Sequence, residues 1–263
     1  MKRLHCILAV ILCITACQAQ DKEIKTFSIL GDSYSTFDGY IPEGNACWYF
    51  STPQGDNDVT CVEQTWWHQF AKDSGLELIL NESYSGSTIC NSGYDGADYS
   101  DRAFTTRMFK VAECKPDLII VFGGTNDYFW SDKPIFGDGE QYFESAVRKL
   151  TKRIKEKRFG KITLFVTPYP HNGIGNYFGG SDWKDSNRHD TSEKNYNGRT
   201  LREYVDVIVA ICNENGIPCL NLFDNFGFDW QKHTSDGCHP NEAGHLLIAQ
   251  AITEKLKALQ LQF

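Results

Sequence analysis

Short apolar runs alternate with longer amphipathic stretches along most of the chain, and this alternation constrains the fold most strongly. The run DLIIVFGG at 117–124 is apolar through its centre, as in a parallel strand that is covered on both faces. Stretch 140–157 instead places apolar side chains about one helical turn apart, at positions that include Phe143, Val147 and Leu150. Such an alternation predicts a parallel sheet with helices on both faces.

The pattern predicts an α/β fold with five strands in one parallel sheet, formed by a single domain over residues 21–263. The strands are expected at Thr26–Leu30, Leu76–Leu80, 117–124, 161–168 and 217–223. The helices are expected at Gln64–Ser74, Arg102–Cys114, Glu140–Lys157, Leu201–Asn215 and Asn241–Leu259.

Residues 1–20 are predicted to be a signal peptide rather than part of the fold. Lys2 and Arg3 precede the short apolar stretch Leu4–Ile14, and the stretch closes on ITAC, which is similar to a bacterial lipobox. We therefore expect lipidation at Cys17 and a lipid-anchored location in the cell envelope, facing the periplasm or the cell surface. The alternative is an ordinary signal peptide cut near Ala19.

The chain is acidic, and this restricts its partners. Without the two basic residues of the leader, 24 basic and 34 acidic residues remain, a formal charge of −10. Such a surface argues against nucleic acid and against attraction to anionic lipid. We expect a neutral small-molecule or glycan substrate, and contact with a membrane only through the predicted anchor.

Seven of the ten cysteines lie beyond the leader, where export permits disulfides. Cys47 and Cys61 bracket a polar loop and form one possible pair, and Cys212 and Cys219 form another. The seven are Cys47, Cys61, Cys90, Cys114, Cys212, Cys219 and Cys238, an odd number that leaves at least one thiol without an intrachain partner. The absence of a CxxC spacing argues against a structural zinc site.

Two connections, Tyr34–Glu63 and Pro168–Gly198, are unusually long for a compact domain. Both follow predicted strands, so both are expected at the sheet edge where parallel α/β proteins bind ligands. Their aromatic residues allow two interpretations, as small cores of the loops themselves or as stacking surfaces for sugars. The aromatic residues to which these interpretations apply include Trp48, Tyr49, Tyr169, Tyr177, Phe178, Trp183 and Tyr196.

Four polar blocks each follow a predicted strand and are expected to meet at that edge: GDSYS (31–35), NESYSGS (81–87), GGTND (123–127) and SDGCHP (235–240). A nucleophilic serine needs a base, and the base needs an orienting acceptor. Ser33, His239 and Asp236 provide these three groups. The backbone N–H groups of Ser33 and Gly86 and the amide of Asn126 would then bind a developing oxyanion.

These blocks resemble those of the SGNH, or GDSL-like, hydrolases, and the resemblance spans residues 26 to about 259. It implies a flavodoxin-like three-layer α/β/α sandwich and a serine esterase without a metal or organic cofactor. Tyr34 stands where the GDSL name has Leu, and Gly93 or Gly96 are alternatives to Gly86 as the donor. No G-x-S-x-G elbow of the α/β-hydrolases is present.

Other polar residues near the blocks have less distinctive surroundings. We expect a structural role for Asp127, and a packing or surface role for His245. Tyr34, His171, Tyr169 and Trp183 are candidate substrate-binding residues. Cys238 is interpreted as a packing residue or a half-cystine.

The predicted activity is hydrolysis of short-chain acyl esters, O-acetyl groups on glycans in particular, through an acyl-enzyme intermediate. A lipid-directed esterase or lysophospholipase would share the same catalytic residues. A non-catalytic carbohydrate-binding surface lipoprotein is a further alternative. A nucleotide-binding module lacks support, because neither G-x-G-x-x-G nor a Walker motif occurs.

Overall fold

The computed structural model describes residues 23–52, 55–157, 160–172, 194–195, 197–224 and 226–263. The predicted signal peptide with Cys17, and the loop aromatics Tyr177, Phe178, Trp183 and Tyr196, lie outside the described residues. Within the described part, no helix is both long and apolar enough to cross a membrane.

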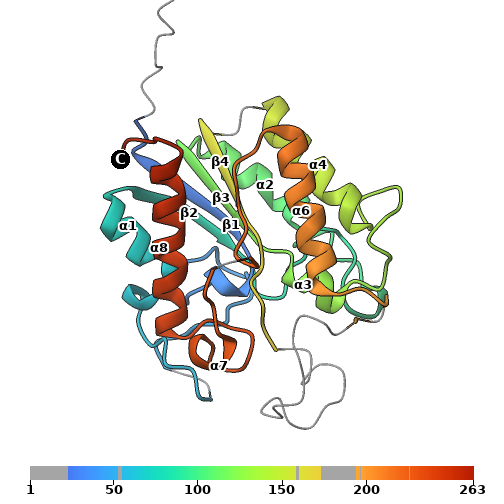
Figure 1. Cartoon of the computed structure of the whole chain (residues 1–263), viewed down its shortest axis with the longest axis horizontal. Helices are drawn as coiled ribbons and strands as arrows, with labels where there is room; N and C mark the ends of the chain where they lie inside the picture. The colour runs from blue at the N-terminus through green and yellow to red at the C-terminus, as the bar shows by residue number, and fades with distance from the viewer. Residues whose placement is uncertain (1–22, 53–54, 158–159, 173–193, 196, 225) are drawn as a thin grey trace, which may run out of the picture.

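Five parallel strands form one sheet in the order β2-β1-β3-β4-β5, which confirms the predicted fold class. Helices α1 and α8 lie on one face, and α2, α4 and α6 lie on the other (Figure 1). The strands are β1 (Thr26–Gly31), β2 (Glu77–Ser83), β3 (Leu118–Phe122), β4 (Ile162–Val166) and β5 (Cys219–Leu220). The helices are α1 (Trp66–Ser74), α2 (Phe104–Glu113), α3 (Thr125–Trp130), α4 (Phe143–Lys157), α6 (Leu201–Asn215), α7 (Trp230–His233) and α8 (Glu242–Ala258), with 3-10 turns η1 (Ser33–Ser35), η2 (Val62–Gln64) and η3 (Tyr94–Gly96).

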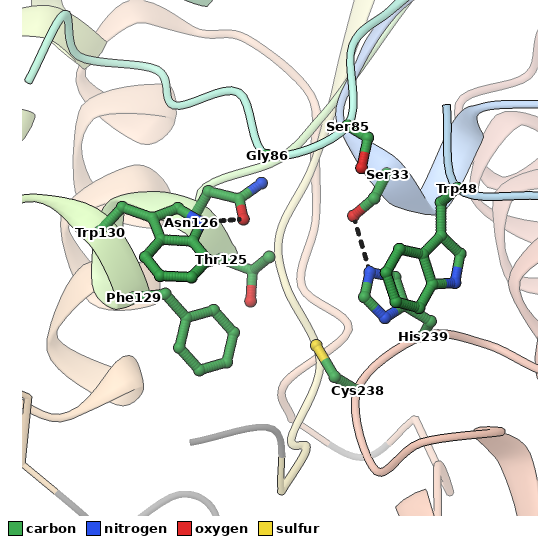
Figure 2. Close-up of a pocket in the computed structure, with 10 residues that line it drawn as sticks. All are labelled: Ser33, Trp48, Ser85, Gly86, Thr125, Asn126, Phe129, Trp130, Cys238 and His239. Atoms are coloured by element: carbon green, nitrogen blue, oxygen red, sulfur yellow. Dashed lines mark hydrogen bonds between the residues drawn. The ribbon is translucent and has the colours of Figure 1, made fainter. Parts of the chain in front are cut away.

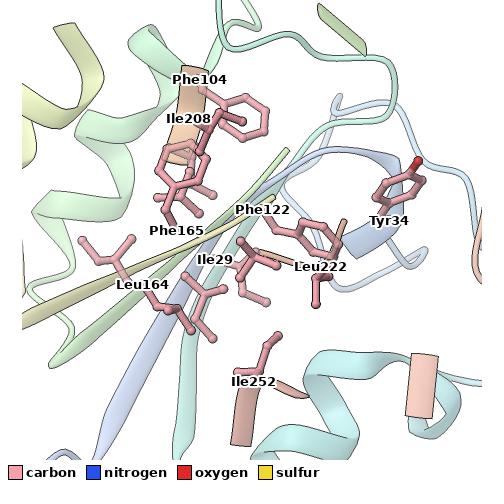
Figure 3. Packing of buried hydrophobic residues seen from close by; sticks show 14 of the residues in the cluster. Ile29, Tyr34, Phe104, Phe122, Leu164, Phe165, Ile208, Leu222 and Ile252 are labelled. Carbon is pink, nitrogen blue, oxygen red and sulfur yellow. The ribbon is translucent and has the colours of Figure 1, made fainter. Parts of the chain in front are cut away.

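The core lies on both sides of the sheet, as the apolar character of β3 predicts. All five residues of β3 are buried. Figure 3 shows Phe104 and Ile208, from α2 and α6, packed on one side of the strands and Ile252, from α8, on the other. Burial of apolar side chains on both sides provides the main stabilisation of such a sandwich.

All five strands differ somewhat from their predicted extents, and β2 and β5 illustrate the causes. β2 continues to Ser83, into the second polar block, because it pairs with β1 as far as Gly31. β5 has only two residues, because the Asn221 side chain accepts hydrogen bonds from the N–H groups of Phe223 and Asp224. This local turn competes with the strand pairing.

The two possible cysteine pairs are not formed, and all seven described cysteines are free thiols. The Cys47 thiol instead donates a hydrogen bond to the Tyr49 carbonyl at 3.2 Å. The Cys212 and Cys219 thiols are hydrogen-bonded to each other. The polar loop that follows β1 is therefore held by packing and hydrogen bonds rather than by a disulfide.

Candidate active site

The first polar block turns sharply as β1 ends, and this turn places Ser33 at the edge of the sheet. Ser33 begins η1, where the Asp32 carboxylate accepts a hydrogen bond from the Tyr34 N–H at 3.1 Å. An aspartate at this position caps the turn, because its carboxylate accepts a hydrogen bond from an N–H group that has no acceptor inside the turn. Only 3% of Ser33 is exposed, so its hydroxyl faces a confined space.

Ser33, His239 and Asp236 form one hydrogen-bonded chain, as the sequence predicts. Figure 2 shows the hydrogen bond between Ser33 and His239. His239 Nε2 lies 3.0 Å from Ser33 Oγ, and His239 Nδ1 lies 2.7 Å from Asp236 Oδ2. An ionised carboxylate only accepts, so the imidazole proton belongs on Nδ1. Nε2 is thereby left as the acceptor for the serine proton, which is the arrangement that general-base activation requires.

The spacing of Asp236 and His239 has a local cause. The other carboxylate oxygen of Asp236 accepts the N–H groups of Cys238 and His239, at 2.9 and 2.6 Å, which folds the segment into a tight turn. Burial raises the pKa of Asp236, but the charge of His239 and these hydrogen bonds outweigh it and lower the pKa to about 2. Asp236 is therefore a carboxylate at neutral pH.

The three predicted oxyanion donors belong to residues of separate segments, Ser33, Gly86 and Asn126, and all three residues line the pocket. Among the described residues, the backbone N–H groups of Ser33 and Gly86 have no hydrogen-bond partner. The Asn126 carboxamide is fixed at both ends, because its oxygen accepts from Trp130 Nε1 and its nitrogen donates to Ser87 O, each at 3.0 Å. Since that nitrogen carries two hydrogens, one stays available for an oxyanion.

Gly86 lines the pocket at the predicted position, and its backbone conformation accounts for the glycine. No atom lies within 4 Å of where its Cβ would be, so crowding does not demand glycine. Its φ of +78° is in the left-handed region, which glycine adopts most readily. Neither alternative glycine lines the pocket, since Gly93 lies against the Tyr99 ring and Gly96 against Asp132.

The pocket around this chain encloses a cavity of about 120 Å³. Trp48 covers the imidazole of His239, with the rings stacked at 3.6 Å between centroids and 14° between planes. Phe129 and Trp130 lie on the opposite side, beside Asn126 (Figure 2). The complete lining is Ser33, Trp48, Ser85, Gly86, Thr125, Asn126, Phe129, Trp130, Cys238 and His239.

Three of the four candidate substrate-binding residues do not line this pocket, which corrects the prediction for them. Tyr34, Tyr169 and His171 are each 0% exposed and lie in the interior next to it. Tyr34 OH hydrogen-bonds Thr125 Oγ1 at 3.3 Å and Cys238 Sγ at 3.2 Å. These residues support the pocket wall instead of contacting a ligand. The fourth candidate, Trp183, lies outside the described residues.

The lining residues that the sequence analysis did not assign are Trp48, Ser85, Thr125, Phe129 and Trp130. One signal for Trp130 was available. It follows Asn126 by four positions, and residues at that spacing share one face of a helix. The sequence pattern predicts no helix over Thr125–Trp130, so this relation was missed.

Buried charges stabilise the turns beneath the donors. Asp127 accepts the N–H groups of Ile89 and Cys90 at 2.8 and 2.9 Å, which confirms its structural role. Burial raises the pKa of Asp127 to about 6, against the lowering effect of these bonds. Arg107 is also buried, and it donates to Gly31 O at 3.0 Å and to Ser87 Oγ at 2.8 Å. Arg107 thereby joins the end of β1 to the segment that carries Gly86 and Ser87.

Asp32, directly before the serine, is buried completely. Burial raises its pKa to about 7, although the Tyr34 N–H and the Arg107 charge act in the opposite direction. Its Oδ2 atom has no hydrogen-bond partner among the described residues. Within the same residues, no three His, Cys, Asp or Glu side chains gather closely enough to hold a metal ion.

A parallel α/β/α sandwich with a Ser–His–Asp chain at the carboxyl edge of its sheet resembles the arrangement that serine hydrolases use. Comparison with known families identifies the group more closely. The model of the GDSL-like lipase/acylhydrolase family matches residues 25–159, and the chain belongs to this family. A search of curated protein sequences finds no match.

Solved structures support the same assignment. A protein from Bacteroides ovatus, named a GDSL-like lipase, is 32% identical, with 90% of this chain and 99% of that chain covered and a TM-score of 0.66. A protein of the same description from Bacteroides uniformis is 31% identical over 89% and 96% of the chains, with a TM-score of 0.64. A carbohydrate acetylesterase from Sinorhizobium meliloti, 19% identical over 89% and 99%, has a TM-score of 0.59 and shares the fold.

Proposed function

We propose that the protein is a serine esterase that removes short acyl groups, O-acetyl groups above all, from glycans. The observation that carries the proposal is the placement of His239 Nε2 3.0 Å from Ser33 Oγ, with its other nitrogen on Asp236, inside a small cavity. This geometry makes a serine hydroxyl into a nucleophile at neutral pH.

The reaction proceeds in two halves. Ser33 Oγ attacks the ester carbonyl while His239 Nε2 takes the hydroxyl proton. The tetrahedral oxyanion is bound by the N–H groups of Ser33 and Gly86 and by the Asn126 carboxamide. Its collapse expels the alcohol, which takes the proton from His239, and leaves an acyl-serine. Water, deprotonated by His239, then attacks this ester and releases the acid, and Ser33 regains its proton.

The size of the cavity favours a short acyl group. About 120 Å³ accommodates an acetyl or a similarly small group beside Ser33, whereas a long alkyl chain would not fit entirely within it. Phe129 and Cys238, which both line the cavity, provide an apolar surface for the acyl methyl group.

The aromatic walls favour a sugar as the alcohol part of the ester. Trp48 and Trp130, both half-buried, stand on opposite sides of the cavity (Figure 2). Tyr94, which is 50% exposed, packs edge-on against Trp130 at 5.4 Å and extends this aromatic surface outward. Flat aromatic faces suit the apolar faces of sugar rings. A carbohydrate acetylesterase shares the fold, so the fold is compatible with this chemistry.

We further infer that the protein works outside the cytoplasm, anchored through a lipid on Cys17. The support is the leader pattern of residues 1–20, which ends in ITAC. A formal charge of −10 on the remainder disfavours binding to anionic lipid surfaces, in agreement with an uncharged glycan substrate.

Hydrolysis of p-nitrophenyl acetate tests the proposed chemistry. Ser33→Ala is expected to lower kcat by about 10⁴-fold or more, because the nucleophile is lost while the remaining site stays intact. Ser74→Ala is the matched control, since Ser74 is a buried serine whose hydroxyl bonds the Phe70 carbonyl at the end of α1. Undiminished turnover in Ser33→Ala would contradict the mechanism. If the protein only binds carbohydrate, the wild type would show no turnover.

The substrate class is tested separately by acetate release from acetylated xylan and by a series of p-nitrophenyl esters. We expect acetate release from the polysaccharide and a steep loss of kcat/KM beyond about four carbons, because the cavity is small. A preference for octanoate or for lysophospholipid micelles would refute the glycan assignment and favour a lipid-directed esterase.

A further inference from the structure

The loop that carries His239 has more of its backbone hydrogen-bonded than a surface loop requires. Each backbone carbonyl from Gly237 to Pro240 accepts a hydrogen bond. The bonds are Asn172 N–H to Gly237 O (2.6 Å), Tyr169 OH to Cys238 O (2.7 Å), Ser235 N–H to His239 O (3.0 Å) and Tyr49 OH to Pro240 O (2.8 Å). Loops are usually the mobile parts of a fold, so this complete pairing is a specific property of the loop.

Two of these four bonds come from tyrosine side chains, and they bracket His239. Tyr169 holds the carbonyl of the preceding residue, and Tyr49 holds that of the following one. Tyr169 follows β4 and Tyr49 lies in the long connection after β1, so the two hydroxyls reach the loop from separate parts of the chain. Both side chains are 0% exposed.

The rings of the same region also restrain the imidazole. Tyr169 stacks on Tyr34 at 5.0 Å, and Tyr34 meets the His239 ring edge-on at 5.7 Å. Trp48, the neighbour of Tyr49 in sequence, stacks on the imidazole at 3.6 Å. Tyr49 therefore fixes the backbone beside His239, and the adjacent Trp48 covers its ring. Because one peptide bond joins Trp48 to Tyr49, the position of each contact depends on the other.

The chemistry of the two hydroxyls suits a permanent structural bond. Burial raises the pKa of Tyr169 and of Tyr49 well above the usual range, and nearby acidic groups add to the effect. Both hydroxyls therefore stay protonated and able to donate throughout the working pH range. Removing either would leave a buried carbonyl without its donor.

We propose that Tyr49 and Tyr169, the tyrosine clamp, position His239 so that Nε2 stays in line with Ser33 Oγ and Nδ1 stays on Asp236. The clamp rests on the proposed function and adds a role to it, because neither residue touches the substrate or the reacting atoms. A displacement of about 1 Å in such a group reduces the rate by up to about 10²-fold. Two hydroxyls on the neighbouring carbonyls are well placed to prevent such a displacement.

Tyr49→Phe and Tyr169→Phe test the clamp, since each removes one hydroxyl and keeps the ring packing. We expect kcat for p-nitrophenyl acetate to fall by about 10- to 100-fold in each, with KM nearly unchanged, because the clamp acts on the imidazole and not on substrate binding. Tyr204→Phe is the matched control. Tyr204 is equally buried, and its hydroxyl accepts from Asn195 at 3.0 Å, away from the His239 loop.

A spectroscopic readout separates positioning from stability. The proton between His239 Nδ1 and Asp236 should give a far-downfield ¹H resonance in the wild type and in Tyr204→Phe. In the clamp variants we expect this resonance to shift and to exchange faster with solvent. Should one clamp variant fail to fold, the other carries the test, because the two hydroxyls act on different carbonyls.

The outcomes are distinct. Clamp variants with wild-type kcat and an unchanged resonance would overturn the clamp. The same would follow if Tyr204→Phe lost as much kcat as they did, since the effect would then be one of general stability. If the wild type hydrolyses no ester while the resonance still responds to the clamp variants, the proposed function fails and the clamp remains.

Discussion

His239 and His245 are six positions apart in the sequence, yet their surroundings differ completely. His239 lies in the loop before α8, 2.7 Å from a carboxylate and open to the cavity. His245 lies in the first turns of α8, 0% exposed, where Nδ1 accepts the Trp66 N–H at 3.1 Å. The residue type is the same, so the neighbouring groups alone determine which imidazole can work as a base.

The electrostatics of the two regions follow from this difference. Burial lowers the pKa of His245 to about 3, and the positive charge of His239 adds to the lowering. His245 is therefore a neutral structural acceptor. His171, the third buried histidine near the site, behaves in the same way, with a pKa lowered to about 3 chiefly by burial. Of these three histidines, only His239 combines a carboxylate partner with access to Ser33.

The largest expected effect is the loss of activity when His239, the proposed base, is replaced. His239→Ala should reduce kcat for p-nitrophenyl acetate by about 10⁴-fold or more, because Ser33 loses its base. His245→Gln should lower kcat far less, by about tenfold at most, because its side chain touches neither Ser33 nor the cavity and reaches the site only through Tyr49, which it meets edge-on at 4.9 Å. Steady-state kinetics on both variants check this, and a comparable loss in His245→Gln would remove the distinction between the two regions.

A second prediction concerns stability against pH. His245 has a lowered pKa in the folded protein, about 3 against 6.5, so the unfolded chain binds more protons between these values. The stabilisation that the neutral His245 ring gives the folded protein is complete above pH 6.5 and is lost as the pH falls toward 3. As the pH falls below about 6, the free energy of unfolding of the wild type should therefore decrease relative to that of His245→Gln, by up to about 1.4 kcal/mol per pH unit.

Urea unfolding of both proteins at several pH values measures this difference. Subtracting the two curves cancels the titration of Asp32 and Asp127, which both proteins share and whose raised pKa values act in the opposite direction. A difference in unfolding free energy that stays constant between pH 4 and 8 would mean that His245 does not titrate as its burial requires.

The smallest expected effect comes from removing the Trp48 ring that stacks on His239. Trp48→Leu removes the stacked indole from His239 while an apolar side chain remains. An aromatic pair contributes about 0.5–1.5 kcal/mol beyond its buried area, so kcat should fall by about 2- to 10-fold. Tyr40→Leu is a suitable control, because Tyr40 packs on Trp67 and does not line the cavity. Equal rates in Trp48→Leu and the wild type would show that the stack does not help to orient the base.

The elements that the sequence predicts well are those whose local pattern and tertiary role agree. Helix α6 has the predicted bounds Leu201–Asn215, because a capping box at Thr200 and a glycine at 216 mark both ends. Helix α3 was missed because six residues that include Asn126 and Asp127 have little helical preference on their own. The Asp127 contacts with the N–H groups of Ile89 and Cys90 help to hold it in place.

The aromatic residues show where prediction from sequence failed. Tyr34 and Tyr169 were placed on the cavity surface, and the structure buries both. Trp48 was one of several loop aromatics without a defined place, and it covers His239. A tyrosine next to a polar block looks the same in sequence whether its ring faces solvent or the core. Burial depends on segments more than a hundred residues away, as the Tyr49–Pro240 bond illustrates.

The sequence by itself determined the layered sheet and the chemical content of its carboxyl edge, since apolar periodicity and strand-end polar blocks are local properties. It also determined the Asp236–His239 turn, which depends on hydrogen bonds within four residues. Only the tertiary structure decided which donors hold the loop around His239, which aromatic rings face the cavity, and that His245 stays neutral. These properties arise from contacts between distant segments, and such contacts exist only once the chain has packed.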